Sequence, residues 1–306
     1  MEFRPYRPGD EEGIRALLSL VFKEKREINW WRWYYQEGPA GPALIWLALN
    51  RGQVVGHRAL VPYRIWDGSG YKIACQATDA AVHPEHRGKG IFRRLTEEVL
   101  AEARERGWAL VFSFPNEKSF PLNRRLGWVP RQKLRKWVKP LFAASFPGYN
   151  KKAPNLKTLH RVGEEFDRLW ELYGTAKTAG ICKDARYLQW RYLDSTRKSN
   201  YILLVWERRG QIMAYSVIGI GGRRGHLLEF MPGSMEPLPL LQGVEKHLGQ
   251  RGVHFMTMWP LPEIPGPAWR RGYVPNLLQA GILALRPLTE EIPSSWRVTP
   301  GDTDYA

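Results

Sequence analysis

The sequence predicts an α/β fold with a mixed, mostly antiparallel central sheet flanked by helices, and it predicts this fold twice along the chain. The first observation is a series of apolar strands separated by glycine turns between residues 43 and 82. The second is a strand, a basic glycine turn and an amphipathic helix in direct succession over residues 76–107. The third is a set of short strings that return in the same order in the second half. With 306 residues, the chain is long enough for two domains.

The N-terminal segment predicts a first strand over residues 2–5, a helix cap at Asp10 and an amphipathic helix. The apolar positions of this helix recur at helical spacing: Ile14, Leu17, Leu18, Val21 and Phe22. An aromatic cluster follows at residues 29–35. It either walls an acceptor site or packs in the core, and packing is favoured because aromatic side chains bury large areas.

Three further strands are predicted over residues 43–49, 54–62 and 72–82, with turns at residues 51–53 and 67–70. Together they predict an antiparallel meander. Its last strand leads into the glycine turn.

The glycine turn is the segment Arg87-Gly88-Lys89-Gly90-Ile91-Phe92. Glycines allow the backbone to turn sharply and to approach a ligand closely. The helix that follows carries apolar residues on one face, and its first N–H groups favour an anion. The turn therefore predicts a phosphate-binding site, although many basic glycine turns on protein surfaces bind nothing.

The string Val82-His83-Pro84-Glu85-His86-Arg87-Gly88-Lys89-Gly90-Ile91 resembles the acetyl-CoA signature of the GCN5-related N-acetyltransferase (GNAT) superfamily. The resemblance implies that the backbone of Arg87, Gly88, Lys89, Gly90, Ile91 and Phe92 holds the diphosphate of acetyl-CoA, the co-substrate. It also implies that Ala80, Ala81 and Val82 hold the pantetheine arm and the thioester. In the family pattern, a Gly or Ala usually stands at the position of Phe92, so this bulky residue is expected either to crowd the diphosphate or to turn into the core.

A second stretch, residues 109–128, resembles the family through Asn116, Ser119, Gly127 and Trp128. By this resemblance we place Asn116 and Ser119 with the cofactor-binding residues. Asn123 stands where many family members have a tyrosine that protonates the departing CoA thiolate. Because a thiol has a pKa near 8.5, losing this acid is expected to slow transfer on the order of 100-fold without abolishing it.

The resemblance implies transfer of an acyl group from CoA to an amine, and an amine is mostly protonated at pH 7. A base is therefore useful. Asp79 is the candidate catalytic base because it precedes Val82 by three residues on the strand expected to carry the thioester. A salt-bridged, structural Asp79 is the alternative, and His57 and His83 are weaker candidates.

The second half repeats features of the first. Trp190-Arg191-Tyr192 echoes Trp31-Arg32-Trp33, and Gly210-Gln211-Ile212 echoes Gly52-Gln53-Val54. Two downstream strings, residues 257–260 and 270–275, echo residues 112–115 and 124–130. Where a phosphate loop is due, residues 233–237 carry no basic residue and end in Pro237, which removes an N–H donor.

We therefore predict a tandem arrangement of two GNAT-like domains. A proline-rich and lysine-rich segment over residues 129–158 predicts a strand that passes into a linker. The acetyl-CoA-binding domain is predicted over residues 1–145 and a degenerate second domain over residues 146–306. We expect the second domain to have lost CoA binding.

Composition limits the remaining functions. No apolar run reaches membrane-spanning length and no leader is evident, so we expect a cytoplasmic protein without membrane insertion. Two distant cysteines predict neither a disulfide framework nor a metal site. The net charge of +16 attracts phosphate, but the charges are scattered and no nucleic-acid module is evident, so we expect no nucleic-acid partner.

The predicted function is acetyl-CoA-dependent N-acetylation of a small-molecule or peptide amine, by direct attack and without a metal. Two alternatives stay open: a non-catalytic CoA-binding or sensing module, and an aminoacyl-transferase-like tandem protein. The aromatic-Arg-aromatic repeat also looks similar to tandem acetyltransferases of cell-surface polysaccharide synthesis, which makes an amino sugar one possible acceptor. The sequence leaves the acceptor and the oligomeric state open.

Overall fold

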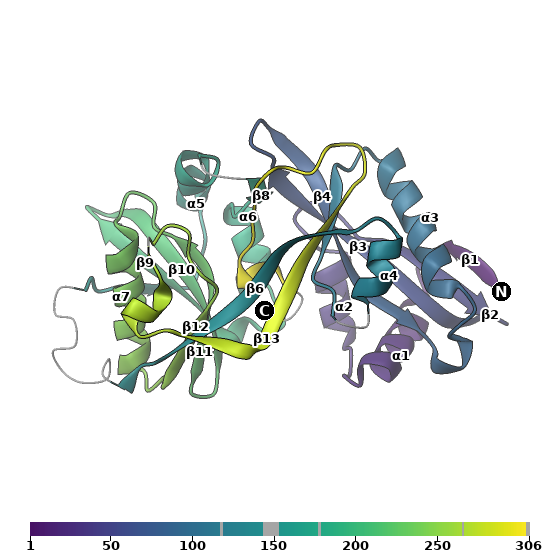
Figure 1. Cartoon of the computed structure of the whole chain (residues 1–306), viewed down its shortest axis with the longest axis horizontal. Helices are drawn as coiled ribbons and strands as arrows, with labels where there is room; N and C mark the ends of the chain where they lie inside the picture. The colour runs from purple at the N-terminus through teal and green to yellow at the C-terminus, as the bar shows by residue number, and fades with distance from the viewer. Residues whose placement is uncertain (117–118, 143–152, 177–178, 265, 304–306) are drawn as a thin grey trace. The chain divides into compact units, whose positions relative to one another are not determined.

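The computed structural model describes residues 1–116, 119–142, 153–176, 179–264 and 266–303. Their contacts form two compact units. Unit 1 comprises Met1–Gln132 and Ile282–Ser294, and unit 2 comprises Lys133–Gly281 and Ser295–Ala306. Each unit is described by itself (Figure 1). The domain boundary expected between residues 145 and 146 lies outside the described residues and stays a prediction.

Unit 1 contains a sheet with the strand order β1-β2-β3-β4-β5-β13. Neighbouring strands are antiparallel except β4 and β5, which are parallel and require a crossover. The helix α3 supplies this crossover, so the predicted mixed, mostly antiparallel sheet is confirmed. The strands are β1 (Glu2–Pro5), β2 (Leu44–Asn50), β3 (Gln53–Trp66), β4 (Tyr71–Val82), β5 (Leu110–Ser113) and the last part of β13 (Val274–Pro287).

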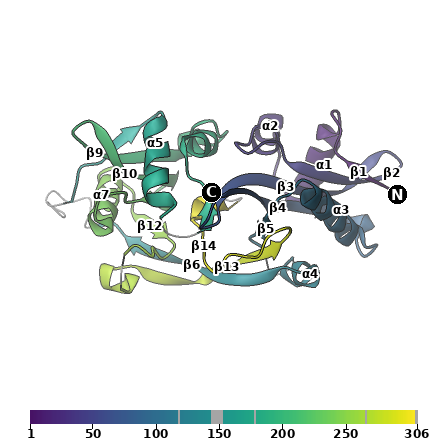
Figure 2. The same cartoon turned by 90° about the horizontal axis from the view of Figure 1, so that it is seen from above.

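The helices of unit 1 cover both faces of its sheet. They are α1 (Glu11–Phe22), α2 (Ile28–Tyr35), α3 (Ile91–Glu105) and α4 (Phe120–Arg125). Gly13 of α1 lies directly against Val54, while Ile91 and Leu95 of α3 lie directly against Gly56 of the same strand. A register shift separates these positions, since Val54 pairs with Leu49 and Gly56 with Ala48, so α1 and α3 lie on opposite faces. Figure 2 shows α3 beside β3 in a second view of the molecule.

The outer strand of unit 1 comes from the end of the chain. Ala284 pairs with Ser113 and Pro287 pairs with Leu110, in antiparallel register. Beyond the strand, the N–H of Leu288 donates to the carbonyl of Ala109 at 3.0 Å. Residues 282–294 therefore complete the sheet that contains β4, the strand that leads into the glycine loop.

Unit 2 has the strand order β6-β12-β11-β10-β9-β7, and a short parallel pair, β8 and β14, stands beside this path. Strands β11 and β12 are parallel, and α7 connects them. The strands are β6 (Val129–Pro140), β7 (Lys157–Leu159), β8 (Ala179–Ile181), β9 (Tyr201–Arg208), β10 (Gln211–Gly221), β11 (Arg224–Met231), β12 (Phe255–Met258) and β14 (Trp296–Arg297). The helices are α5 (Glu164–Leu169), α6 (Ala185–Leu188) and α7 (Pro237–Gln250).

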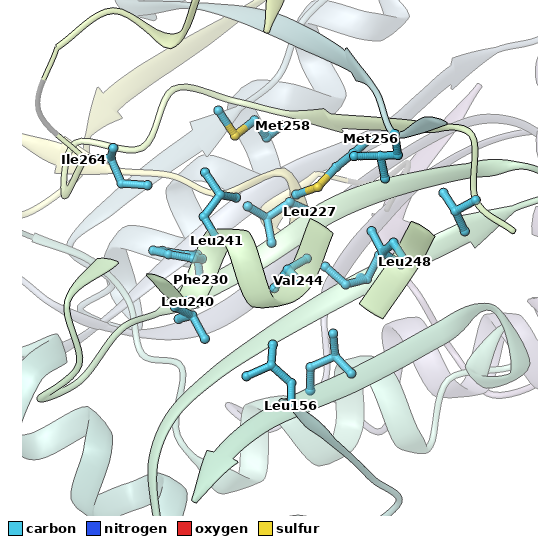
Figure 3. Close-up of a cluster of buried hydrophobic side chains, with 14 of the residues drawn as sticks. Leu156, Leu227, Phe230, Leu240, Leu241, Val244, Leu248, Met256, Met258 and Ile264 are labelled. Atoms are coloured by element: carbon cyan, nitrogen blue, oxygen red, sulfur yellow. The ribbon is translucent and has the colours of Figure 1, made fainter. Parts of the chain in front are cut away.

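The core of unit 2 lies between α7 and the sheet. Figure 3 shows Leu240, Leu241, Val244 and Leu248 of α7 facing side chains of β11 and β12. These residues recur at helical spacing and therefore lie on one face of α7. Burial of this face against the sheet forms the core. Among the strand residues that meet them are Leu227, Phe230, Met256 and Met258.

The two units share their order of elements. Each has an antiparallel meander, then a helix, then a parallel strand. The first hairpin of each meander turns at an Arg-Gly pair with positive φ at both residues, 50° and 80° at Arg51-Gly52 and 53° and 76° at Arg209-Gly210. Two positive φ angles in succession are typical of type I′ turns.

Candidate active site

The predicted loop lies between the end of β4 at Val82 and the start of α3 at Ile91. Gly88 has a φ of 76° and Gly90 a φ of 75°, values that side-chain-bearing residues rarely adopt. A Cβ added to either glycine would meet no atom within 4 Å. The glycines therefore allow the turn itself and leave open space beside its backbone.

The loop offers unused hydrogen-bond donors. Among the described residues, none accepts a hydrogen bond from the backbone N–H groups of residues 88–93. The side chains of Arg87 and Lys89 bond to nearby carbonyls, Arg87 Nε to Val82 at 3.3 Å and Lys89 Nζ to Glu85 at 3.1 Å. Free N–H groups at a helix N-terminus next to exposed cations fit a phosphate-bearing ligand such as the diphosphate of CoA.

The side chain of Phe92 packs against other residues of unit 1. It is half-buried, and the guanidinium carbon of Arg58 lies 5.6 Å from the centre of its ring. The same carbon lies 6.0 Å from the ring of buried Trp128, and Arg286 lies 5.3 Å from that ring. Phe92 thus belongs to a packed series of rings and guanidinium groups, as expected if its side chain turns into the core.

Asp79 occupies a β-bulge near the end of β4. His57 pairs with Ala81 and Ala59 pairs with Thr78, so Asp79 and Ala80 together lie opposite Arg58. The φ of Asp79 is 44°, in the left-handed region that Asp enters more readily than most residues. Bulges redirect side chains and are common beside active sites.

Two side chains hold the carboxylate of Asp79. The hydroxyl of Tyr35, at the end of α2, donates to Oδ2 at 2.5 Å. Arg26 Nη2 lies 3.7 Å from Oδ1, and the Asp79 side chain is 10% exposed. The aromatic cluster at residues 29–35 thus packs, since Trp31, Trp33, Tyr34 and Tyr35 are buried, and its last member also reaches the site.

His57 supports the bulge from β3. Its Nδ1 lies 2.8 Å from the carbonyl oxygen of Asp79, and a carbonyl only accepts, so Nδ1 carries the hydrogen. Burial lowers the pKa of His57, which keeps the ring neutral. Its Nε2 is buried and has no hydrogen-bond partner among the described residues. His83 instead accepts a hydrogen bond from the N–H of Glu85 at 3.4 Å.

Asn116 and Ser119 bond to each other where α4 begins. The N–H of Ser119 donates to Asn116 Oδ1 at 2.9 Å, and the N–H of Asn116 donates to Ser119 Oγ at 3.1 Å. Their structural role is thus to shape this turn, and their predicted cofactor contact stays a prediction. Asn123, in place of the usual tyrosine, is 3% exposed, and its Oδ1 has no hydrogen-bond partner within the described part of the chain.

The corresponding segment of unit 2 differs from the loop of unit 1. A Cβ on Gly233 would overlap with the backbone carbonyl of Met213, so this turn is pressed against β10. Pro237 stands in the first turn of α7 and donates no N–H. Neither open space nor a full set of donors is present there.

Four residues that touch the site were missed in the sequence: Arg26, Tyr35, Arg58 and Arg286. Tyr35 lay inside the aromatic cluster, for which packing in the core was favoured over a place in the acceptor site. The remaining three carry no local signal, because their partners lie far away in the sequence. Among the described residues, no group of His, Cys, Asp or Glu is arranged to hold a metal ion. None of the helices described here is long and apolar enough to cross a membrane.

Unit 1 thus combines a mixed sheet, a bulged strand and an open glycine loop at a helix N-terminus, an arrangement that suits an anionic ligand. Residues 2–131 match the family described as "Acetyltransferase (GNAT) domain". This segment, which is less than half of the chain, is therefore similar to the GNAT acetyltransferase family. A comparison with curated proteins finds no match.

Solved structures share the fold. A GCN5-related N-acetyltransferase from Anabaena variabilis ATCC 29413 has a TM-score of 0.72 and 12% identity, covering 94% of this chain and 73% of that one. A probable N-acyltransferase of unknown function from Enterococcus faecalis V583 has a TM-score of 0.70 and 12% identity, with the same coverage. A GCN5-related N-acetyltransferase from Kribbella flavida has a TM-score of 0.69 and 13% identity, covering 94% and 72%.

Proposed function

We propose that this protein transfers an acetyl group from acetyl-CoA to an amine. The observation that carries the proposal is the open glycine loop at the start of α3, with free N–H groups over residues 88–93, inside a domain of the GNAT family. Arg87, Gly88, Lys89, Gly90, Ile91 and Phe92 would hold the diphosphate, and Ala80, Ala81 and Val82 would hold the pantetheine arm. The acceptor class, a small molecule or a peptide with an amine, follows from the family.

In the proposed reaction, the neutral amine nitrogen attacks the thioester carbonyl carbon. The carbon–sulfur bond breaks, an amide forms, and CoA leaves as a thiolate. Deprotonating an alkylamine at pH 7 costs about 4.6 kcal/mol, so a base beside the thioester assists. Asp79 is the proposed base because the bulge aims its carboxylate away from the regular ladder and Tyr35 fixes its orientation.

Asn123 bears on the departure of the thiolate. An amide side chain has no acidic proton to give at neutral pH, so the thiolate leaves without an acid from this position. A thiol with a pKa near 8.5 is a tolerable leaving group. The same substitution favours the second candidate function, a protein that binds CoA without transferring its acyl group.

We propose that the two units arose by duplication and that only unit 1 binds acetyl-CoA. Its order of elements and its Arg-Gly turn repeat those of unit 1, whereas its turn at Gly233 has neither the space nor the donors of the loop. We propose that one chain binds one acetyl-CoA. A cytoplasmic location is part of this proposal, since two cysteines at distant positions, Cys75 and Cys182, predict no disulfide framework.

The test is a thiol-release assay with acetyl-CoA against a panel of amino sugars, polyamines, amino acids and peptides. We expect release with at least one amine, and a loss of about 100-fold in kcat for Asp79→Asn. Glu85→Gln, an exposed acid on the same segment, is the matched control and is expected to keep full activity. Tight acetyl-CoA binding without release for any amine would instead select the binding module.

A further inference from the structure

Unit 2 contains a small pocket that the acetyl-transfer proposal does not use. Three aromatic residues, Trp170, Tyr215 and Phe230, form part of its wall, together with the charged residues Lys183, Glu229 and Arg297. The pocket has a volume of about 30 Å³. This space admits a few water molecules or a small head group, and is far too small for CoA.

Two buried carboxylates beside this pocket share one lysine. Lys183 Nζ lies 2.9 Å from Glu229 Oε1 and also forms an ion pair with Asp302. The exposed fractions are 6% for Lys183 and 2% for each carboxylate. Both carboxylates therefore contact the ammonium of Lys183. Buried Arg191 bonds to the carbonyls of Gly301 and Thr303, on either side of Asp302, and Arg297 pairs with Glu263 and donates to the carbonyl of Phe230 at 3.0 Å.

One oxygen of Glu229 is available. Oε1 accepts hydrogen bonds from Lys183 and, at 2.7 Å, from the hydroxyl of Tyr192. No residue in the described part of the chain donates to Oε2. An acceptor without a donor is costly in a buried side chain. Burial raises the pKa of Glu229, and the nearby charge of Asp302 adds to this effect, despite the attraction of Lys183.

We propose that this pocket binds the ammonium group of a small organic amine. The ammonium would donate to Glu229 Oε2, while the rings of Trp170, Tyr215 and Phe230 surround its substituent. Aromatic faces attract organic ammonium ions, which distinguishes this ligand class from a hydrated inorganic cation. The site consists of unit 2 residues alone and does not depend on acetyl transfer.

Calorimetric titration of the full chain with methylammonium and ethylammonium tests the proposal. Methanol serves as the neutral probe and potassium as the inorganic one. We expect both ammonium ions to bind and both other probes to fail. Glu229→Gln keeps the size of the side chain and removes its charge, so it is expected to weaken ammonium binding about 10-fold or more. Glu245→Gln, in a buried acid of the same unit that pairs with Lys139 at 2.7 Å, is the matched control and is expected to bind as the wild type does.

Several outcomes overturn the proposal: no ammonium binding by the wild type at concentrations up to about 100 mM, equal binding of potassium or methanol, or undiminished binding by Glu229→Gln. Should Glu229→Gln fail to fold, Trp170→Leu replaces it as the test. The leucine is apolar but lacks the aromatic face, so ammonium affinity is expected to fall about 3-fold or more. An unchanged affinity in a folded Trp170→Leu protein also contradicts the proposal.

Discussion

The hydroxyl of Tyr35 donates a hydrogen bond of 2.5 Å to the carboxylate of Asp79. Tyr35 ends α2 and is fully buried, whereas Asp79 lies in the bulge of β4. The bond therefore links the aromatic helix to the strand expected to carry the thioester. A carboxylate held in this way has one orientation, which is what a base positioned beside a reacting amine requires.

Tyr35→Phe removes the hydroxyl and keeps the ring. We expect kcat to fall about 10-fold, because an orienting bond worth about 1.4 kcal/mol is lost. The KM for acetyl-CoA is expected to stay the same, since the loop is untouched. Tyr34→Phe, in the neighbouring buried ring, is the control; equal kinetics for the two variants would exclude a positioning role for Tyr35.

Gly88→Ala tests the loop against a matched turn. Gly88 and Gly52 have φ values of 76° and 80°, and an added Cβ meets nothing at either position. Both alanine variants are expected to lose about 1 kcal/mol of unfolding free energy through backbone strain. Gly88→Ala alone is expected to weaken acetyl-CoA binding, by about 10-fold, because its backbone should approach the diphosphate. Equal affinities in the two variants would show that residues 87–92 do not form the site.

Asn123→Leu tests whether position 123 takes part in the chemistry. Asn123 is buried and its Oδ1 has no partner among the described residues, so an apolar side chain of similar size removes an unmet acceptor. We expect unfolding free energy to stay the same or to rise by about 1 kcal/mol. The rate of thiol release is expected to change less than about 3-fold. A loss of activity in a folded Asn123→Leu protein would give Asn123 a role that our mechanism does not contain.

His57 predicts a pH dependence of stability. Burial lowers its pKa in the folded state, so below about pH 6.5 the unfolded chain binds a proton that the folded chain does not. Unfolding free energy therefore falls as the pH falls through about 6.5, by up to about 1.4 kcal/mol per pH unit, and is unaffected well above this value. His57→Asn keeps a donor for the Asp79 carbonyl and removes the titration, so denaturant titrations should show a shallower loss. An identical slope in the variant would mean that His57 does not titrate on unfolding.

Local patterns predicted the parts of the fold that depend on local physics. The meander, the glycine loop at residues 87–92 and the amphipathic helix after it are each specified by alternation, turn residues and helical spacing within short windows. For the same reason, the Arg-Gly turn of the second half was recognisable as an echo of the first. Asp79 was chosen as the candidate base from its spacing to Val82 in the sequence. The bulge around Asp79 could not be predicted, because it depends on the pairing of β4 with β3.

Short sequence patterns could not predict the pairing of segments that are far apart in the chain. Nothing near Ala284 indicates that it completes the sheet of unit 1, because the strand partner of Ser113 is set by tertiary packing. Tyr35 was one aromatic residue among several, and only the fold brings its hydroxyl to Asp79. The pairing of Lys183 with two carboxylates likewise arises because Glu229 and Asp302 converge from distant segments.

Calorimetric titration of acetyl-CoA into the full chain tests the central claim most directly. The wild-type protein is expected to bind one acetyl-CoA per chain, and Gly88→Val is expected to lose this binding while it stays folded, because the branched side chain enters the space beside the loop. Gly233→Val is unsuitable as a comparison, since its side chain would collide with Met213, so Gly52→Val serves as the control. Two equivalent sites per chain, or full affinity in a folded Gly88→Val protein, would contradict the assignment of cofactor binding to unit 1 and its loop.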